Sequence, residues 1–254
     1  MKTSHLTSSS FAAIAGCAFS LSAAHAQPVP PDGLTGTITA VQATVLAGQK
    51  PNLNWTVNYP SIVERVVDID PDKITPKKNL KANVRIIGQG VTGGLAGGGY
   101  FFAPTHATMS INDPFNFTSI FYGINPDVNP ANIIDLGTKL GTTYTNNLVQ
   151  AGKAIRFGGY YVNGTSTGTH YKSNDGTNNV RFLVNGDVPP AAVPDHDGPS
   201  LESFLRPYLD TTGKVQIGPM DVIVFMELTH SPTQQAESGY DLQDMVLLVT
   251  FEEL

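Results

Sequence analysis

Short runs of β-branched and aromatic residues, separated by turn-forming residues, recur along most of this 254-residue chain. Residues 53–59, LNWTVNY, alternate cleanly between apolar and polar side chains, which is typical of a half-buried strand. Further strands are expected at residues 34–48, 62–69, 80–87, 107–111, 117–122, 154–162, 180–184, 221–229 and 245–251. Because asparagine, glycine and proline turns lie between them, the sequence predicts an all-β fold, mainly antiparallel, of the β-sandwich or jelly-roll kind.

Two segments favour helical structure instead. Residues 200–209 place apolar side chains at helical spacing until Pro207, which predicts one short amphipathic helix there. A single helical turn is expected after Pro130. Neither segment forms part of a βαβ repeat, so residues 27–254 are expected to form one β-sandwich domain. A split near residues 90–99, into a smaller N-terminal and a larger C-terminal part, stays open.

The N-terminus has the layout of a secretory signal peptide. Lys2 precedes an apolar stretch, and Ala24-His25-Ala26 stands before Gln27, which predicts cleavage of residues 1–26. The mature chain would then be periplasmic, extracellular or bound at the cell surface. The motif ending at Cys17 resembles a lipobox, so lipid anchoring at this cysteine is an open alternative. No later segment reaches the ~20 apolar residues of a membrane-spanning helix, so none is expected in the mature chain.

Composition excludes several classes of function for the processed chain. Cleavage removes Lys2 and Cys17, the only cysteine, and leaves 14 basic residues against 21 acidic ones, a formal charge of −7. A disulfide scaffold and a cysteine nucleophile are thereby excluded. No stripe of lysine and arginine is present to neutralise phosphates, so no nucleic-acid partner is expected. The densest basic patch, residues 71–78, is expected to be a solvated turn.

Residues 85–99 contain the spacing of a dinucleotide-binding loop at Gly88, Gly90 and Gly93, with Asp113 about twenty residues on. Pyrophosphate binding requires a helix that begins in this loop. Five glycines within residues 93–99 disfavour such a helix, because each interior glycine costs up to ~1 kcal/mol relative to alanine. We therefore predict a glycine loop between strands and no nucleotide cofactor.

Other catalytic patterns are incomplete. Residues 164–168, GTSTG, match the nucleophile elbow of hydrolases, but a loop follows Ser166 where the elbow needs a helix. Asp68, Asp70 and Asp72 have the spacing of the first ligands of a calcium loop, but Lys73 replaces its glycine. No catalytic residue is assigned. A secreted polysaccharide hydrolase stays open through paired carboxylates drawn from Asp175, Asp187, Asp195 and Asp197.

Aromatic residues suggest a partner class. They occur as neighbours or alternating rows at Tyr100-Phe101-Phe102, Phe115, Phe117, Phe121-Tyr122 and Tyr160-Tyr161. An exposed aromatic platform beside polar side chains is a means by which β-sandwich modules bind sugars. Adjacent residues of a strand face opposite sides of the sheet, so at least half of these rings should belong to the core. The partners considered are therefore polysaccharides or other surface proteins.

The C-terminal strands carry the candidate metal ligands Glu227, Asp241 and Asp244. Glu227 ends a mostly apolar row within residues 221–229 and should be partly buried. If this strand pairs with residues 245–251 as a hairpin, the connecting loop returns Asp241 and Asp244 to Glu227. Three carboxylates repel one another unless protons or a cation intervene, and Ca²⁺ takes six to eight oxygen ligands. The alternative is that both aspartates cap turns through their own backbone while Glu227 reaches solvent.

The same region, residues 220–254, resembles the end of a secreted bacterial β-domain family, domain of unknown function 4114, through the signature Asp241-Leu242-Gln243-Asp244-Met245. Members usually have Asp-Tyr-Asn-Asp where this chain has Leu242 and Gln243. The resemblance implies an exported, surface-associated domain with acidic loops suited to calcium. The sequence thus predicts an exported, non-catalytic structural or binding module stabilised by calcium. A polysaccharide-active hydrolase or a carbohydrate-binding module is the alternative.

Overall fold

The computed structural model describes residues 35–40, 53–58, 60–190, 203–237 and 239–254. The predicted signal peptide, Cys17, Asp195 and Asp197 lie outside these ranges. Strands β1 (Thr35–Ala40) and β2 (Leu53–Asn58) form an antiparallel pair in which Ile38 lies opposite Trp55. Both strands fall within segments where strands were expected.

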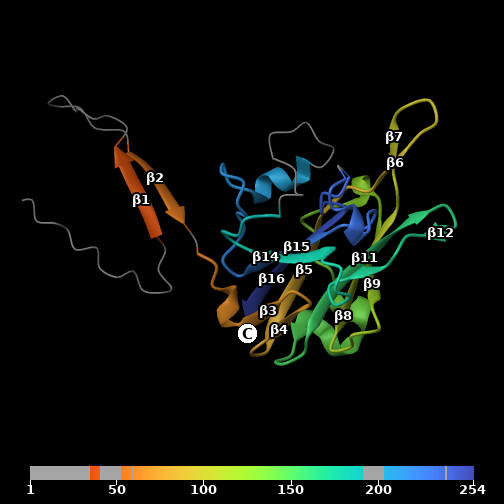
Figure 1. Cartoon of the computed structure of the whole chain (residues 1–254). Helices are drawn as coiled ribbons and strands as arrows, with labels where there is room; N and C mark the ends of the chain where they lie inside the picture. Colours follow the sequence, from red (N-terminus) through yellow and green to blue (C-terminus); the bar gives the residue numbers. More distant parts are fainter. Residues whose placement is uncertain (1–34, 41–52, 59, 191–202, 238) are drawn as a thin grey trace, which may run out of the picture. The chain divides into compact units, whose positions relative to one another are not determined.

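A five-stranded antiparallel sheet has the strand order β10, β5, β16, β15, β14. Strands β5, β14, β15 and β16 are labelled in Figure 1. Its strands are β5 (Leu80–Gln89), β10 (Leu148–Val149), β14 (Val180–Val184), β15 (Asp221–Met226) and β16 (Met245–Glu253). β15 and β16 pair directly, from Asp221 opposite Thr250 to Phe225 opposite Val246. The predicted C-terminal hairpin is therefore confirmed.

A seven-stranded antiparallel sheet has the order β3, β4, β11, β8, β9, with β12 and β13 also paired to β11. Its strands are β3 (Val67–Asp70), β4 (Lys73–Pro76), β8 (Thr105–Ile111), β9 (Thr118–Gly123), β11 (Ile155–Asn163), β12 (Ser166–Thr167) and β13 (Tyr171–Lys172). The strand expected at residues 62–69 begins later, because the 3-10 helix η1 (Val63–Arg65) precedes β3.

One main core lies between these two sheets. The five-stranded sheet contributes Val222, Val224 and Met226 of β15, and the seven-stranded sheet contributes Met109 and Phe157, all without exposed surface. Each sheet therefore buries one face against the other, which is the packing of a β-sandwich. The predicted all-β fold is confirmed.

A second core covers the opposite face of the five-stranded sheet. Ile223 and Phe225 of β15 pack there with residues of the neighbouring strands β5 and β16 and of the segments before and after β15: Ile87, Leu205, Leu209, Val215, Tyr240, Leu242 and Val246. Residues Ser203–Tyr208 form the 3-10 helix η4 where a short amphipathic helix was expected. Because both faces of β15 are covered, its residues 222–226 are all apolar and buried.

The glycine-rich segment forms a β-hairpin that projects from the two sheets (Figure 1). Strands β6 (Thr92–Gly94) and β7 (Tyr100–Phe102) pair, and Gly97, Gly98 and Gly99 in the connecting turn have positive φ angles of 103°, 96° and 91°. Residues other than glycine rarely adopt this backbone conformation. The predicted glycine loop between strands is confirmed, and a hairpin stands where a dinucleotide site would need a helix.

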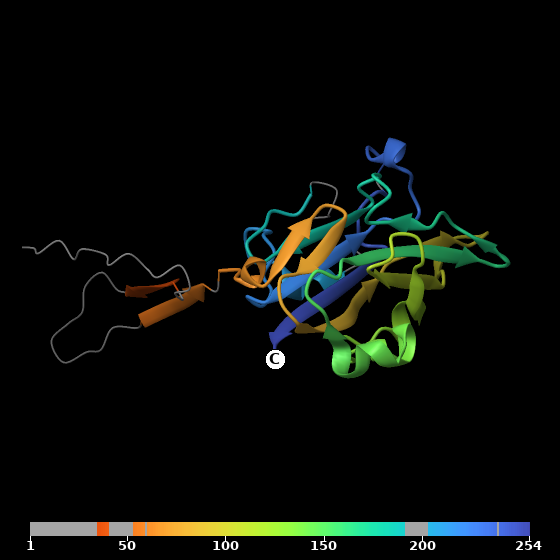
Figure 2. The ribbon, with the colours of Figure 1, turned by 90° about the horizontal axis from the view of Figure 1, so that it is seen from below.

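The helical turns within residues 136–147 lie on one side of the strands, in green in Figure 2. The α-helix α1 (Leu136–Leu140) begins after Asp135, whose carboxylate accepts hydrogen bonds from the amides of Gly137 and Thr138. The turn expected after Pro130 therefore begins later than predicted. The 3-10 helices η2 (Asn125–Asp127), η3 (Thr142–Asn147) and η5 (Pro232–Gln234) are the other short turns.

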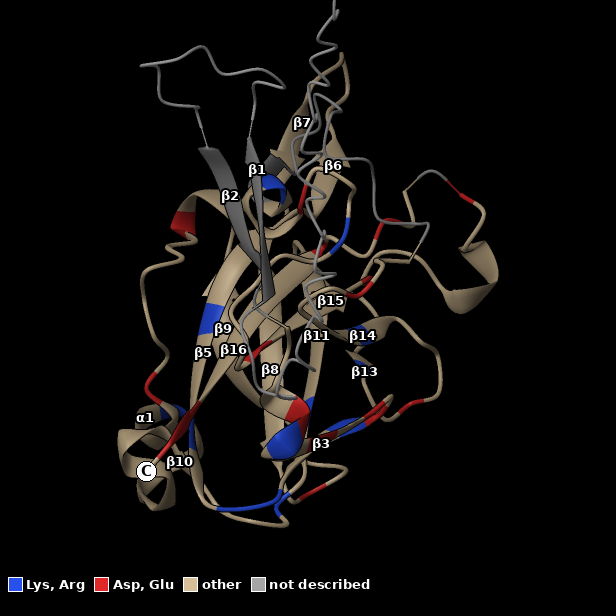
Figure 3. Ribbon diagram, turned by 90° about the vertical axis from the view of Figure 1, so that its left-hand side faces the viewer, with Lys and Arg blue, Asp and Glu red and all other residues tan. Residues whose placement is uncertain are grey.

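Acidic and basic residues lie side by side around β3 and β4 (Figure 3). The ammonium of Lys73 lies 3.5 Å from the Asp70 carboxylate, and that of Lys77 lies 2.9 Å from Asp68. The prediction of a solvated turn at residues 71–78 is wrong, because residues 73–76 form β4 and bury Ile74 completely. Within the described ranges, no helix is long and apolar enough to cross a membrane.

Candidate metal centre

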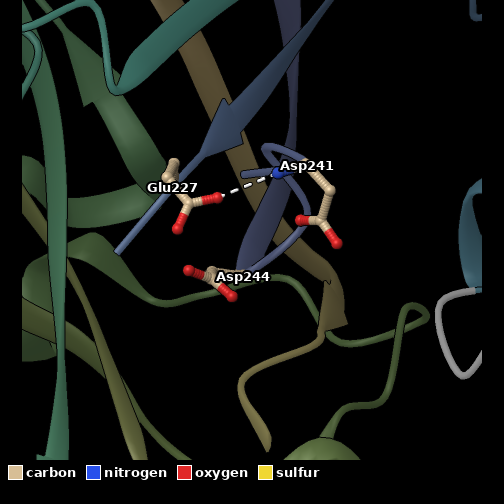
Figure 4. Close-up of side chains that lie close together, drawn as sticks. All are labelled: Glu227, Asp241 and Asp244. Carbon is tan, nitrogen blue, oxygen red and sulfur yellow. Dashed lines mark hydrogen bonds between the residues drawn. The ribbon is translucent and has the colours of Figure 1, made fainter. Parts of the chain in front are cut away.

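The loop from residue 227 to 244, here called loop 227–244, joins the end of β15 to the start of β16. Because these strands are paired, Glu227 at its beginning and Asp244 at its end lie close together. One oxygen from each of Glu227, Asp241 and Asp244 lies within 4.8 Å of the other two (Figure 4). The structure thus brings together the three acidic residues proposed from the sequence, in a cluster that could hold a metal ion.

Glu227 is completely buried and accepts several hydrogen bonds from its own loop. Its Oε1 accepts from the amides of Thr229 (3.1 Å) and His230 (2.9 Å) and from the Thr229 hydroxyl (2.8 Å). Its Oε2 accepts from the amides of Asp241 (3.1 Å) and Leu242 (3.4 Å). The alternative in which Glu227 reaches solvent is therefore wrong, because the loop folds over its carboxylate.

The two aspartates bond in different ways. Asp244 is 5% exposed, and its Oδ2 accepts from the amides of Leu228 (2.7 Å) and Thr229 (2.9 Å). Asp241 is half-buried, and its Oδ1 accepts from the amide of Gln243 (2.9 Å), two residues on. Asp241 therefore caps its own turn, as the alternative predicted, whereas Asp244 fastens the end of the loop to its beginning.

Glu227 and Asp244 have opposite pKa shifts. Burial, the negative charge of Glu227 and the hydrogen bond between the two carboxyls raise the pKa of Asp244 well above its ordinary value. Burial also acts to raise the pKa of Glu227, but hydrogen bonds from Asp244, Thr229 and the loop amides outweigh it and leave this pKa lowered. Without a cation, the proton that the two carboxyls share is therefore held by Asp244 in preference to Glu227.

The three carboxylates offer a cation oxygen ligands. Gln243, 2% exposed, lies between the two aspartates in the chain, and its backbone pairs with Met226 at the end of β15. Its side chain and the loop carbonyls could add to the carboxylate oxygens. A divalent cation at this position would take over from the shared proton in neutralising the carboxylates.

Sequence reasoning missed the groups of the loop that complete the site. The amides of Leu228 and His230 and the hydroxyl of Thr229 bind the carboxylates directly. The imidazole Nδ1 of His230 also lies 3.2 Å from Glu227 Oε1. No pattern in the sequence marks these groups, because backbone amides carry no residue signature and threonine is common near strand ends.

The hydrolase candidates have turn-capping roles where the structure describes them. Asp175 accepts from the amides of Lys172 and Thr177, and Asp187 accepts from the amide of Val184. Ser166 of the elbow motif lies on β12, opposite Asn163 of β11. A hairpin therefore stands where the elbow would need a strand followed by a helix.

A cavity of about 860 Å³ lies elsewhere in the fold. Its lining includes Lys81, Asn83, Asp135 and Glu252. Glu252 is eight residues after Asp244 along β16, which places the two about 26 Å apart at 3.3 Å per strand residue. The acidic cluster is thus not part of this cavity.

No family model, curated protein or solved structure matches this chain. The resemblance to domain of unknown function 4114 therefore stays a prediction.

Two histidines lie on the outer face of the seven-stranded sheet. His106 alternates with Ala107, which is buried in the main core, and His170 alternates with the buried Tyr171. Burial lowers the pKa of His106. Burial and the nearby Lys172 ammonium lower the pKa of His170 to about 4, against the opposing effect of Asp175. Both imidazoles are therefore neutral at pH 7.

The lowered pKa of His170 predicts acid sensitivity. The unfolded chain takes up a proton near pH 6.5, whereas the folded chain holds His170 neutral down to about pH 4. Stability should therefore fall as pH decreases between these values. Nuclear magnetic resonance titration of the His170 ring should give a midpoint near 4, and His170→Asn should flatten this part of the stability profile. A midpoint near 6.5 would contradict the burial of the ring.

Proposed function

We propose that this chain is an exported, non-catalytic β-sandwich module in which calcium holds loop 227–244 closed. The observation that carries the proposal is the convergence of Glu227, Asp241 and Asp244 at the ends of two paired core strands. The signal-peptide layout of residues 1–26 and the resemblance of residues 220–254 to a secreted β-domain family support export.

The bonding of the carboxylates favours a structural role over catalysis. A general acid or base must reach a substrate within hydrogen-bond distance. Glu227 has no exposed surface, and its oxygens accept from five amide or hydroxyl donors of the same loop. Such a carboxylate fixes the path of the chain and has little freedom to exchange protons with a bound molecule.

The available ligands favour calcium among biological cations. The carboxylates, Gln243 and the loop carbonyls are hard oxygen donors, which suit Ca²⁺ and Mg²⁺ better than zinc or copper. Mg²⁺ demands octahedral geometry and usually retains several waters, whereas Ca²⁺ accepts six to eight oxygens in irregular arrangements. A loop that is closed at both ends by carboxylates provides such an irregular set.

Thermal unfolding with calcium and with chelator tests the proposal. Calcium that binds only the folded chain should stabilise it by ~2.7 kcal/mol at a hundredfold excess over the dissociation constant. For a domain of this size, that gain corresponds to a midpoint higher by roughly 5 to 10 °C. The gain should grow with pH, because the cation must displace the proton of Asp244.

Two variants separate the cation from the shared proton. Asp244→Asn should be about as stable as the native chain in chelator, since its amide can donate to Glu227 as the protonated acid does. This variant should lose most of the stabilisation that calcium gives the native chain. Asp70→Asn makes the same change at a half-exposed aspartate in the incomplete calcium-loop pattern and should keep the gain. An unchanged native midpoint at millimolar calcium would overturn the calcium role and leave the proton alone to hold the loop.

A further inference from the structure

Three rings from neighbouring strands stack across the outer face of the seven-stranded sheet. Tyr122 of β9 lies opposite His106 of β8, which in turn lies opposite Tyr160 of β11. The His106 ring stacks on Tyr122 at 4.3 Å and 25°, and on Tyr160 at 4.5 Å and 20°. We call Tyr122, His106 and Tyr160 the ring row; β9, β8 and β11 can be followed in Figure 1.

Two further rings extend the ring row along the same face. The centres of the His170 and Tyr160 rings lie 5.2 Å apart, and those of Phe117 and His170 lie 5.7 Å apart, both pairs in edge-to-face geometry. His170 reaches over β11 because Gly158 has no side chain there, and its Nε2 lies 2.8 Å from the Thr108 hydroxyl. A Cβ on Gly158 would come within 2.6 Å of the Tyr171 carbonyl. The glycine therefore allows the extended row to form.

The ring row presents both an apolar ring face and polar ring edges. Tyr122 is 57% exposed although His106 covers one side of its ring, so the other side faces solvent at the last strand of the sheet. The Ser119 hydroxyl donates to the Phe121 carbonyl (3.0 Å) and must therefore accept from His106 Nδ1 (2.7 Å). This places the ring hydrogen of neutral His106 on Nδ1 and leaves Nε2 as an acceptor.

The centre of this face carries hydroxyl and neutral imidazole groups. The tyrosine hydroxyls donate and accept, and His106 Nε2 accepts. Lys172 lies at the far end, with its ammonium 5.2 Å from the centre of the Phe117 ring. An acidic or phosphorylated ligand would find no cation beside Tyr122, His106 and Tyr160 among the groups that the structure describes. A neutral ligand rich in hydroxyl groups fits these donors and acceptors.

We propose that the ring row binds a neutral sugar residue of a polysaccharide. The apolar face of a pyranose ring stacks on the exposed face of Tyr122, and its hydroxyls bond to the edges of Tyr122, His106 and Tyr160. Stacking within the row fixes the rings before the ligand arrives, so little side-chain freedom is lost on binding. Sugar binding here needs no cation in loop 227–244, so this proposal and the calcium proposal can fail separately.

Affinity electrophoresis tests the proposal. The protein is run in native gels containing amylose, mixed-linkage β-glucan, galactomannan or xylan, and in a gel containing acidic polygalacturonate. At least one neutral polysaccharide should retard the native chain. Tyr122→Ala should raise the corresponding dissociation constant at least tenfold, whereas Tyr122→Phe, which keeps the ring face, should cause a smaller loss.

Tyr100→Ala provides the matched control. Tyr100 is 49% exposed on β7 and also packs against a ring, that of Phe102, but lies outside the ring row. The Tyr100→Ala variant should bind the polysaccharide like the native chain, and all variants should keep the native thermal midpoint. Retardation by polygalacturonate alone, by none of the neutral polysaccharides, or equally for Tyr122→Ala and the native chain would each overturn the proposal. So would an equal loss for Tyr100→Ala.

Discussion

Glu227→Gln should lower the free energy of unfolding by about 3 kcal/mol, because it removes a buried negative charge that several donors share. Glutamine keeps one acceptor oxygen. Its amide nitrogen would face either the amides of Asp241 and Leu242 or those of Thr229 and His230. In both orientations two buried N–H donors meet a third donor, and neither water nor another acceptor can replace the lost oxygen without opening the loop.

Urea unfolding at pH 7 in chelator measures this effect without a contribution from calcium. Glu237→Gln is the matched control, since it makes the same change in the same loop at a side chain that is 57% exposed. The control should stay within about 0.5 kcal/mol of the native chain. If the two variants were equally stable, the charge of Glu227 would not hold the loop, and the basis for a cation at this cluster would disappear with it.

Glu227→Gln and Asp244→Asn together distinguish the roles of the two acids. Asp244 has a raised pKa and Glu227 a lowered one, so the neutral amide imitates the native state of Asp244 but not that of Glu227. In chelator, Glu227→Gln should therefore lower the free energy of unfolding strongly, and Asp244→Asn should leave it nearly unchanged. Both variants should lose the stabilisation by calcium.

The strands that form the acidic cluster could be predicted because their signals are local. The apolar runs at residues 221–229 and 245–251 are long enough to indicate strands. No other strand is expected between them, so an antiparallel hairpin is the simplest pairing. Glu227 lies near the end of the first run and Asp244 directly precedes the second, so their proximity follows from the hairpin alone. What the sequence could not supply is the path of loop 227–244, which depends on backbone amides of Leu228, Asp241 and Leu242.

Features that depend on tertiary pairing were not predictable. The sequence drew attention to Tyr122 and Tyr160 among several aromatic residues but not to His106, and only the register between β9, β8 and β11 aligns the three rings. Residues 71–78 look like a polar turn because lysines and prolines surround Ile74, whose side chain is completely buried. The continuous apolar run of β15 is consistent with a strand that is covered on both faces, but it does not show which parts of the chain cover each face.

That division of β15 between two cores predicts a large effect for Phe225→Ala. Phe225 is completely buried in the second core, among Leu205, Val215 and other residues that cover the five-stranded sheet. Truncation of a buried phenylalanine typically costs 3–5 kcal/mol, through lost burial and the cavity that remains. We expect about 4 kcal/mol here, because both strands that flank β15 hold its backbone in place and limit collapse into the cavity.

Chemical unfolding of Phe225→Ala should be compared with that of Phe115→Ala, whose ring is 80% exposed and whose loss should cost less than about 0.5 kcal/mol. Hydrogen exchange adds a second readout, since amides of residues 205–217 should exchange faster in Phe225→Ala if this segment is held by packing on Phe225. A cost below about 1 kcal/mol with unchanged exchange would mean that the segment does not pack on the sheet in solution. In that event β15 would have a solvent-exposed face of Ile223 and Phe225, and the apolar run that continues through both faces would have no physical explanation.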